Sequence, residues 1–509
     1  MTAVASKTLG AAFAAAAARR NDRPFLVDAD VSFDGLGAAR KSLQLADSLH
    51  KRGLSAGERV VFLCRPSVLH TLAWFSAIRV GAIATNLHLL ETPERMAETI
   101  AWLDAGLVIF DDEFAELAKS LAQSLPSVRY VQLGQLSSSH SDTTAALSLD
   151  AADPHDPAAI VLSSGSTGRP KGVVHTHASM LRSIEAGIDV YRGIDSDDSV
   201  LVCIGTSFGG WCNVVIPFVG AGTRLVFQRR FEPQAFLHGL ANERITIAPL
   251  VPTMWRMVLA AQSEQYDLSS VKLAFMSGES ASRGDVEQIR KRITDHVRAA
   301  YLSTEGACGC GIVADEDQFL TDSNVPAGRP LHGAGVRIIA ANGDMNDTLP
   351  AGQTGEILLR GRSLASGYWK DPQRTAERFR DGWWRSGDTG YVTQDGRVVV
   401  VGRTDHVINS GGVKIQAEEI EAALMRHPGI RQAAVVGAPD PKWGQRAEAY
   451  VVVQHNDVDS QTIGTWCQAE GQIPLLRFLK AVHVVDKLPT GPTGKLYRPA
   501  LLTLQTDMA

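Results

Sequence analysis

The sequence has no long hydrophobic run, no excess of basic residues and no paired cysteines. Its most apolar stretch, residues 71–87, is interrupted by Arg79 and is too short and too mixed to span a bilayer. The formal net charge is -5, and no cluster of Lys and Arg marks a nucleic-acid or membrane surface. The chain therefore predicts no membrane span and no nucleic-acid partner.

Cysteine usage argues against a zinc site and against a disulfide framework. The six cysteines are scattered, and none forms a CxxC pair with zinc spacing. Cys308 and Cys310 flank a single glycine and are expected to be small buried thiols. This pattern fits a reducing compartment, so we expect a cytoplasmic protein.

The alanine-rich start of the chain, Leu9 to Arg20, needs its own interpretation. It lacks the leucine-rich core of a signal peptide, and its basic pair follows the alanines instead of preceding them. Because alanine is the best helix former, we expect an ordinary first helix.

The 509 residues, 45% hydrophobic and 21% charged, predict a globular protein of two or more domains. Up to about Pro330, short apolar strands alternate with helical patterns, which indicates parallel sheets covered on both faces. The strands expected there are Val60–Cys64, Gly81–Ala84, Ala159–Leu162, Val200–Ile204, Thr223–Phe227, Ile245–Ala248, Lys272–Met276 and Val297–Ala300.

After Pro330 the pattern changes. Strands at Val336–Ile339, Glu356–Leu359 and Val398–Val401 are joined by Gly- and Asp-rich turns, which predicts a smaller antiparallel unit. Beyond Gly402, one expected helix and three expected strands are enough for a separate lobe.

The most informative segment is residues 163–172, Ser-Ser-Gly-Ser-Thr-Gly-Arg-Pro-Lys-Gly. Its glycines let the backbone approach an anion closely, its hydroxyls add donors, and Lys171 adds a cation. This combination suits the binding of a polyphosphate. It differs from the P-loop, because Lys171 follows Pro170 and precedes Gly172. A flexible linker, the plain alternative, has no use for a lysine at a fixed place after a strand.

This segment resembles the phosphate-binding loop of the adenylate-forming superfamily, which contains acyl-CoA synthetases, peptide-synthetase adenylation domains and luciferases. Further motifs follow in that superfamily's order. They are Ser277–Ser280, Tyr301–Glu305, Gly355–Ile357, Gly367–Pro372, Trp384–Asp388, Gly402–Ile408 with Glu418–Glu421, and Leu488–Lys495.

The resemblance implies an α/β fold in which a large N-terminal domain, residues 1–402, contains two parallel-type sheets flanked by helices and a small β-barrel-like subdomain. It also implies a hinge at 403–405, with Asp405 as the hinge residue, and a small mobile α+β domain at 406–509. The expected activity is ATP-dependent formation of an acyl-adenylate with release of pyrophosphate, followed by acyl transfer to coenzyme A. A homodimer is among the assemblies that the sequence allows.

The resemblance also assigns roles to single residues. Lys495, Lys171, Thr167 and Glu305 are the expected catalytic residues, and Glu305 with Thr167 the expected Mg²⁺ ligands. A carboxylate beside a triphosphate calls for a cation between them, and Mg²⁺ prefers one or two carboxylates plus phosphate oxygens. The full set of expected ATP contacts is Ser163, Ser164, Gly165, Ser166, Thr167, Gly168, Lys171, Gly278, Glu279, Ser280, Tyr301, Leu302, Ser303, Thr304, Asp388, Arg403 and Lys495.

The thiol and acyl sites are less closely defined. Ser410, Gly411 and Gly412 are expected to line the coenzyme A tunnel. The expected acyl pocket consists of Phe208, Gly209, Trp211, Ser277 and Ala307, with core packing as the alternative for Phe208 and Trp211.

No acidic residue occurs at 207–210, which argues against an amino-acid substrate and leaves a medium-chain or aromatic acid as the expectation. His175 and His177 are expected to be structural, because no third metal ligand accompanies them.

Two other functions remain alternatives. An acyl-AMP ligase would load the phosphopantetheine thiol of a carrier protein supplied by another chain. A regulatory ATP sensor would bind the nucleotide without turnover, but it would have no need of both Lys171 and Lys495.

Overall fold

The computed structural model describes most of the chain. The described residues are 6–136, 149–163, 170–207, 209–261, 265–279, 281–321, 328–341, 343–454, 458–469, 476, 478–490 and 496–502. The chain divides into two compact units: a larger one of Met1–Val336 and Leu359–Trp384, and a smaller one of Arg337–Leu358 and Arg385–Ala509. The expected domain boundary at residue 402 and the hinge at 403–405 stay predictions.

The larger unit contains a nine-stranded sheet whose central strands run parallel. In spatial order its strands are β15 (Arg329–Pro330), β14 (Ala307–Asp315), β13 (Val297–Ser303), β12 (Leu273–Ser277), β11 (Ile247–Leu250), β9 (Ser199–Val202), β10 (Arg224–Phe227), β1 (Pro24–Val27) and β2 (Ser32–Asp34). The antiparallel pairs lie at the two ends of this sheet.

The second large sheet of this unit has seven strands. Its order is β18 (Gly367–Tyr368), β8 (Lys171–Thr176), β7 (Pro157–Ser163), β4 (Ile83–Asn86), β3 (Arg59–Leu63), β5 (Ala105–Phe110) and β6 (Arg129–Gln132). The five strands from β7 to β6 are parallel, whereas β8 and β18 are added antiparallel at one edge.

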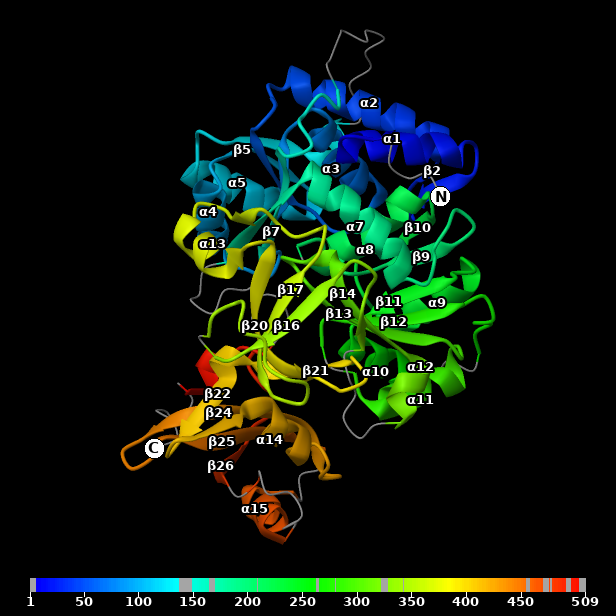
Figure 1. Cartoon of the computed structure of the whole chain (residues 1–509). Coiled ribbons are helices and arrows are strands. Elements are labelled where there is room, and N and C mark those ends of the chain that lie inside the picture. Colours follow the sequence, from blue (N-terminus) through cyan, green and yellow to red (C-terminus); the bar gives the residue numbers. More distant parts are fainter. Residues whose placement is uncertain are drawn as a thin grey trace. The chain divides into compact units, whose positions relative to one another are not determined.

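Helices connect and cover these strands (Figure 1). They are α1 (Leu9–Arg20), α2 (Gly35–Lys51), α3 (Val68–Arg79), α4 (Pro93–Trp102), α5 (Ala115–Ser124), α6 (Leu133–Leu136), α7 (His177–Val190), α8 (Gly209–Ala221), α9 (Pro233–Asn242), α10 (Pro252–Ala260), α11 (Arg283–Arg292), α12 (Glu316–Thr321) and α13 (Pro372–Arg378). The expected first helix, Leu9 to Arg20, is confirmed, and the Thr8 hydroxyl caps it by accepting from the Ala11 N–H.

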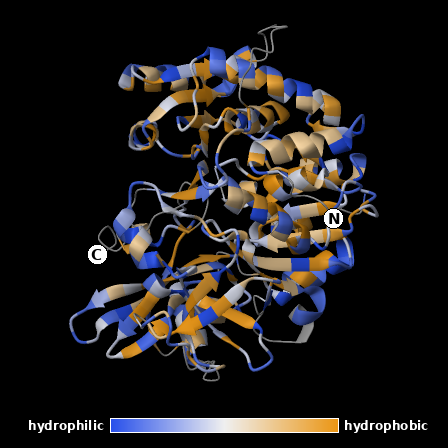
Figure 2. Ribbon diagram, turned by 45° about the horizontal axis from the view of Figure 1, so that its top comes forward, coloured by the Kyte–Doolittle hydropathy of each residue, from blue (hydrophilic) through white to orange (hydrophobic). Residues whose placement is uncertain are grey.

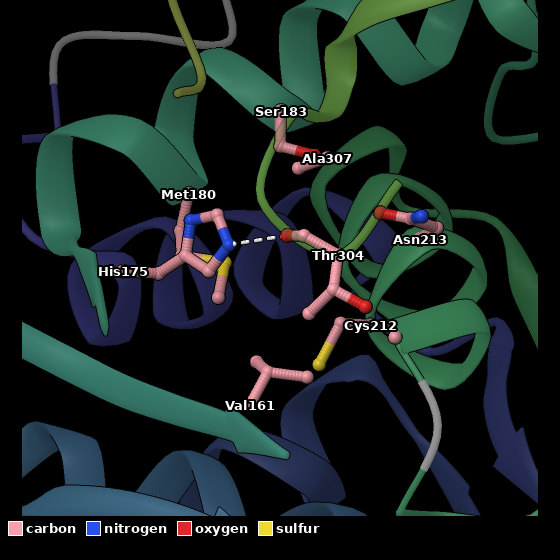
Figure 3. A pocket seen from close by; sticks show the side chains of 9 residues that line it. Val161, His175, Met180, Ser183, Cys212, Asn213, Thr304 and Ala307 are labelled. Carbon is pink, nitrogen blue, oxygen red and sulfur yellow. Dashed lines mark hydrogen bonds between the residues drawn. The ribbon is translucent and has the colours of Figure 1, made fainter. Parts of the chain in front are cut away.

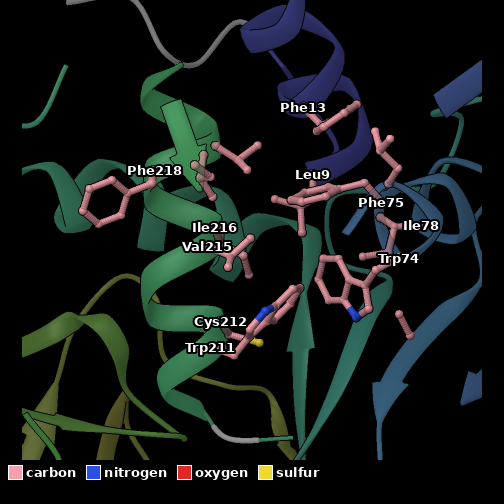
Figure 4. Close-up of a cluster of buried hydrophobic side chains, with 14 of the residues drawn as sticks. Leu9, Phe13, Trp74, Phe75, Ile78, Trp211, Cys212, Val215, Ile216 and Phe218 are labelled. Atoms are coloured by element: carbon pink, nitrogen blue, oxygen red, sulfur yellow. The ribbon is translucent and has the colours of Figure 1, made fainter. Parts of the chain in front are cut away.

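The main core joins both large sheets through buried helices. Helix α3 is buried along nearly its whole length, which fits a helix that is apolar all round. Figure 4 shows side chains of α1, α3 and α8 meeting in this core, among them Phe13, Trp74 and Phe218. The cluster also takes in Phe62 of β3 and Val200 of β9, so one hydrophobic core ties the two sheets together.

The remaining strands form two five-stranded sheets. The first contains β16 (Gly335–Ile339), β17 (Gly355–Arg360), β20 (Trp383–Val392) and β19 (Phe379–Arg380), with β21 (Val398–Arg403) paired to β20. The second contains β23 (Val413–Gln416), β22 (Val407–Ser410), β25 (Gly444–Val453) and β24 (Ile430–Asp440), with β26 (Leu479–Val484) paired to β25. Helices α14 (Ala417–Leu424) and α15 (Ser460–Ala469) lie in the same part of the chain as this second sheet. Side chains of α14 pack in one hydrophobic core with those of the sheet.

The α/β class expected from the sequence is confirmed, with parallel strands between helices in the larger unit and mixed α and β structure near the C-terminus. Hydrophobic residues gather on the inner strands and helices, whereas hydrophilic residues lie mostly outside (Figure 2). Within the described ranges, every helix is too short or too polar to cross a membrane.

Candidate active site

The strand that begins at Lys171 is the first element of the site. Ser163, at the end of β7, pairs with Lys171, at the start of β8, in an antiparallel ladder. The intervening Ser164, Gly165, Ser166, Thr167 and Gly168 lie outside the described residues, so their expected phosphate contacts stay predictions. What the structure establishes is that this Gly- and Ser-rich segment connects two directly paired strand ends.

Strand β18 borders β8 on its other side. Gly367 and Tyr368 pair with Val174 and Val173, and the Trp369 N–H donates to the Gly172 carbonyl at 2.7 Å. A Cβ atom at Gly172 would lie 2.8 Å from an Ile160 methyl carbon and 2.9 Å from the Trp102 ring. Glycine is therefore required at 172 by close packing.

Glu305 lies in the turn between β13 and β14 and is 8% exposed. The Tyr368 hydroxyl donates to its Oε1 atom at 2.9 Å, and the Trp384 Nε1–H donates to the Tyr368 oxygen at 3.2 Å. Burial, and then the neighbouring Glu305 carboxylate, raise the pKa of the Tyr368 phenol, which keeps its proton. The structure thus brings Glu305 next to β18, the strand that pairs with the Lys171 strand β8.

Backbone contacts hold this turn from two sides. Nε2 of His175 on β8 donates to the Thr304 carbonyl at 2.8 Å (Figure 3), and the Ala365 N–H donates to the Glu305 carbonyl at 2.9 Å. The fully buried Ser363 hydroxyl donates to the Gly306 carbonyl at 2.6 Å. The position of Glu305 is therefore set by β8 and by the segment before β18.

Both histidines beside the expected phosphate loop make contacts inside the protein. Burial lowers the pKa of His175 and of His177 to about 4, so both rings are neutral near pH 7. Nδ1 of His177 accepts from the Leu9 N–H at the start of α1, at 3.2 Å. These contacts agree with the structural role expected for both.

Gly209 packs against the same turn. A Cβ atom at Gly209 would lie 2.7 Å from Thr304 Oγ1 and 3.3 Å from its Cβ. Gly209, Thr304 and Ala307 border a cavity of about 10 Å³, drawn in Figure 3, which is the size of one water molecule. It is too small for a carboxylic acid, so it marks a close junction of elements and not a substrate volume.

The other residues expected to line the acyl pocket lie in different parts of the larger unit. Trp211 is fully buried in the main core, with its ring 5.4 Å from that of Trp74 (Figure 4). Ser277 ends β12, next to β13. Phe208 lies outside the described residues. The assignment of these residues to an acyl pocket stays a prediction.

The expected adenine contacts lie at the carboxyl ends of two adjacent parallel strands. Ser277 of β12 pairs with Ala300 of β13, and Gly278 follows with a positive φ of 89°. Ligands of open α/β sheets bind at such strand ends. The Glu279 carboxylate accepts from the Thr253 hydroxyl at 2.6 Å, which fixes its side chain.

Tyr301, Leu302 and Ser303 close β13 at the same edge as Ser277 and Gly278. Ser280, the remaining expected contact of the β12 end, lies outside the described residues. The adenine-binding role of this edge stays a prediction.

In the smaller unit, Asp388 and Arg403 face each other across β20 and β21. Arg403 donates to Asp388 at 2.9 Å and to Asp405 at 3.2 Å, and Asp405 lies in the short 3₁₀ turn Thr404–His406. Burial tends to raise the pKa of Asp405, but the Arg403 guanidinium and His406 outweigh burial and lower it. The expected ribose residue and the expected hinge residue thus share one arginine.

The expected coenzyme A residues form a tight turn. Ser410 ends β22, and Gly411 and Gly412 follow with positive φ values of 60° and 86° before β23 begins. Left-handed backbone of this kind favours glycine. Lys495 lies outside the described residues, so its catalytic role stays a prediction.

A hollow of about 500 Å³ lies beside Lys171 in the larger unit. Its lining includes Arg95 and Glu98 of α4, Tyr368, and Arg374 of α13. Its lining contains both cations and carboxylates, so the described lining does not form a purely positive surface.

The site residues that the sequence patterns miss are those that hold Glu305. His175, Ser363, Tyr368 and Trp384 contact it or its turn, yet none is among the expected site residues. Tyr368 lies inside the Gly367–Pro372 motif, and this motif is the sequence feature that could have identified it as a site residue.

The donor set fits Mg²⁺ held jointly by protein and phosphate. Within the described ranges no three His, Cys, Asp or Glu side chains gather as a metal cluster. Glu305 is a buried carboxylate with a hydroxyl donor on one oxygen. A single carboxylate of this kind suits a cation that takes its other ligands from phosphate and water.

Comparison with known families tests the resemblance found in the motifs. Residues 13–369 match the family described as AMP-binding enzyme, and residues 419–495 match the AMP-binding enzyme C-terminal domain. The chain belongs to the AMP-binding enzyme family. The resemblance to adenylate-forming enzymes is confirmed.

Members of this family resemble the chain along most of its length. It is 30% identical to a feruloyl-CoA synthase of Amycolatopsis sp., covering 90% of this chain and 91% of that one. It is 30% identical to 4-coumarate–CoA ligase 1 of rice, covering 91% and 86%.

Solved structures agree on the fold of this AMP-binding enzyme. The amide bond synthetase McbA of Marinactinospora thermotolerans superposes with a TM-score of 0.87 at 24% identity, covering 97% of this chain and 99% of that one. The o-succinylbenzoate CoA synthetase of Bacillus subtilis, solved with its acyl-adenylate intermediate, gives 0.85 at 22%, covering 96% and 97%.

Proposed function

We propose that this protein is an AMP-forming acid–thiol ligase that uses ATP to activate a carboxylic acid and passes the acyl group to coenzyme A. The observation that carries the proposal is the junction of the Lys171 strand with Glu305 through Tyr368, in a chain of the AMP-binding enzyme family. A lysine on β8 and a buried carboxylate that is hydrogen-bonded to the adjacent strand β18 suit a Mg²⁺-bound polyphosphate.

In the first half-reaction, a carboxylate oxygen of the acid attacks the α-phosphorus of ATP. The bond from that phosphorus to the bridging oxygen breaks, and pyrophosphate leaves. Lys171 balances phosphate charge, Glu305 would hold Mg²⁺, and the strand ends at Gly278 and Tyr301 accommodate adenine. When bound there, Mg²⁺ would supply positive charge beside the phosphates.

In the second half-reaction, the thiol sulfur attacks the acyl carbonyl carbon, loses its proton, and expels AMP. Ser410, Gly411 and Gly412 are the residues we assign to the thiol's path. Asp388 is assigned to the ribose hydroxyls, and its bond to Arg403 fixes the carboxylate for that contact.

For the acid, we favour an aromatic acid over a medium-chain one. Two relatives that are 30% identical carry the names feruloyl-CoA synthase and 4-coumarate–CoA ligase, and both names denote hydroxycinnamic acids. Hydroxycinnamates therefore come first among the acids to be tried.

For the acceptor, coenzyme A is favoured and a carrier-protein thiol is the alternative. A relative that is 28% identical is a fatty acid–[acyl-carrier-protein] ligase of Streptomyces coeruleorubidus, which is the observation that keeps the alternative. A homodimer and a cytoplasmic location stay predictions, and the six free cysteines agree with a reducing compartment.

The activity is tested by pyrophosphate release from ATP with ferulate, 4-coumarate, benzoate and octanoate, each with coenzyme A, with a phosphopantetheinylated carrier protein, or with neither. We expect release that requires both an acid and Mg²⁺, and a thioester with coenzyme A. Tight ATP binding without pyrophosphate release for any acid would instead indicate a nucleotide sensor.

The role assigned to Lys495 has its own test. Lys495→Ala should nearly abolish adenylate formation, because no cation would then bridge the carboxylate and the α-phosphate. Thioester formation from supplied acyl-adenylate should remain largely intact. Equal loss of both half-reactions would show that this lysine is structural or acts throughout.

A further inference from the structure

Three buried side chains form a directed hydrogen-bond chain that ends on Glu305. Trp384 is 3% exposed, and Tyr368 and Glu305 are each 8% exposed. The indole N–H of Trp384 donates to the Tyr368 oxygen at 3.2 Å, and the Tyr368 hydroxyl donates to Glu305 Oε1 at 2.9 Å.

The direction of both bonds follows from the chemistry of the groups. An indole N–H can only donate, so it occupies a lone pair of the phenol oxygen. The phenol proton then points to the carboxylate, which in its ionised form can only accept. The Tyr368 hydroxyl therefore cannot rotate to another acceptor, and its proton stays in the hydrogen bond to Glu305.

The backbone of Tyr368 is fixed as firmly as its hydroxyl. It pairs with Val173 on β8, two residues after Lys171, and its N–H donates to the Thr375 hydroxyl at 2.9 Å. The aromatic ring packs edge-on against Phe379 with a centroid distance of 5.4 Å. Tyr368 therefore links the Lys171 strand to the Glu305 carboxylate by a rigid path.

We propose that Tyr368 is a positioning residue for Glu305, and that Trp384 holds Tyr368 in that role. This inference rests on the proposed function, in which Glu305 is the Mg²⁺ ligand. A carboxylate that is free to rotate must lose that freedom when it ligates a cation. Tyr368 restricts this rotation before the cation binds, because it holds one carboxylate oxygen. This sets the direction of the lone pairs that ligate the cation.

The experiment measures metal binding directly. Binding of Mn²⁺, a paramagnetic substitute for Mg²⁺, is followed by electron paramagnetic resonance in the presence of an ATP analogue with a methylene bridge between the α- and β-phosphates. No acid is needed, and no turnover occurs. Tyr368→Phe should weaken Mn²⁺ binding about tenfold, which is the effect of losing one hydrogen bond to a charged group.

Tyr266→Phe is the matched control. It also removes one tyrosine hydroxyl, which donates to the Gln234 side-chain oxygen at 3.1 Å in another part of the larger unit. Its Mn²⁺ affinity should equal that of the unmodified protein. Equal weakening in both variants would overturn the inference, since the effect would then reflect general loosening of the fold.

A double-mutant cycle tests whether Tyr368 acts through Glu305. Glu305→Gln alone should weaken Mn²⁺ binding more than Tyr368→Phe does. Adding Tyr368→Phe to Glu305→Gln should then cause no further loss. An additional tenfold loss in the double variant, or an unchanged affinity in Tyr368→Phe alone, would contradict the inference.

Trp384→Phe extends the test and guards against misfolding of the tyrosine variant. It leaves the Tyr368 hydroxyl in place but frees it to rotate, so Mn²⁺ affinity should fall by a smaller factor, about threefold. Full affinity in this variant would contradict the part assigned to Trp384. If unmodified protein binds Mn²⁺ and the analogue but releases no pyrophosphate with any acid, the proposed function fails while this inference still stands.

Discussion

Gly209 and Gly210 stand side by side at the start of α8, yet their surroundings differ sharply. A Cβ atom at Gly209 would lie 2.7 Å from Thr304 Oγ1, whereas one at Gly210 would have its nearest neighbour, an Ile204 methyl carbon, at 3.8 Å. Thr304 immediately precedes Glu305. A side chain at 209 would therefore press against Thr304 and the turn that carries Glu305.

Gly209→Ala should lower the rate of pyrophosphate exchange by at least about tenfold, since small displacements of catalytic groups are costly. Gly210→Ala, the matched control, should keep near-normal activity and an equal or higher melting temperature, because alanine favours helix. The account of this junction would be wrong if both variants exchanged pyrophosphate at the same rate.

At the scale of single residues, sequence patterns suggest candidate site residues but not the contacts that hold them. Lys171 and Glu305 come from motifs with a physical meaning, a glycine-rich anion loop and a Tyr-x-x-Thr-Glu turn. The bond from His175 to the Thr304 carbonyl joins residues 129 positions apart in the chain. No local pattern encodes such a pairing, because it depends on how β8 and the turn after β13 pack in three dimensions.

Among the elements, the turn between β13 and β14 depends on the segment before β18. The Ser363 hydroxyl accepts from the Gly309 N–H at 2.7 Å and donates to the Gly306 carbonyl at 2.6 Å, with no solvent exposure. The Gly309 N–H and the Gly306 carbonyl are thus both hydrogen-bonded by the Ser363 side chain, which comes from another segment.

Ser363→Ala should leave both backbone groups without this partner and cost about 2 to 3 kcal/mol of stability. We expect a melting temperature lower by several degrees and weaker Mg²⁺ activation of pyrophosphate exchange. Ser366→Ala is the control, because Ser366 lies in the same segment but is exposed, and its hydroxyl donates to the Val174 carbonyl at 3.1 Å. Equal melting temperatures for the two variants would show that the Ser363 bonds are not needed to hold this turn.

Element by element, apolar runs locate the parallel strands within a few residues. The expected strands at Val60–Cys64 and Ala159–Leu162 correspond to β3 and β7. Strands β8 and β18 are not foreseen, since one is half polar and the other has two residues. Their structure follows from pairing at a sheet edge, which is a long-range effect that overrides local propensity.

At the scale of the whole molecule, one chain must catalyse two different half-reactions. Adenylation needs a cation at the α-phosphate, whereas thiol attack needs that face of the adenylate open. A conformational change about Asp405 is the hypothesis that reconciles them.

Asp405→Pro should restrict backbone rotation at this point, because proline fixes φ near -65° and removes the N–H. Adenylation, measured by pyrophosphate exchange, should survive within roughly tenfold, an energy change of about 1.4 kcal/mol. The coenzyme A-dependent half-reaction should fall much further.

The control, Asp405→Ala, removes the carboxylate that accepts from Arg403 but leaves the backbone free. It should affect both half-reactions equally and mildly. If Asp405→Pro spares both half-reactions, residue 405 is not the hinge. If both collapse together with the melting temperature, the substitution has damaged the fold.

In adenylate formation the acid's carboxylate oxygen attacks the α-phosphorus of ATP, and ¹⁸O labelling of the acid detects this attack. The acid is supplied with ¹⁸O in both carboxylate oxygens, together with ATP, Mg²⁺ and coenzyme A, and the products are analysed by mass spectrometry. The account predicts one ¹⁸O atom in each AMP released and none in pyrophosphate or inorganic phosphate. Label in inorganic phosphate, with ADP as the other product, or unlabelled AMP, would contradict it.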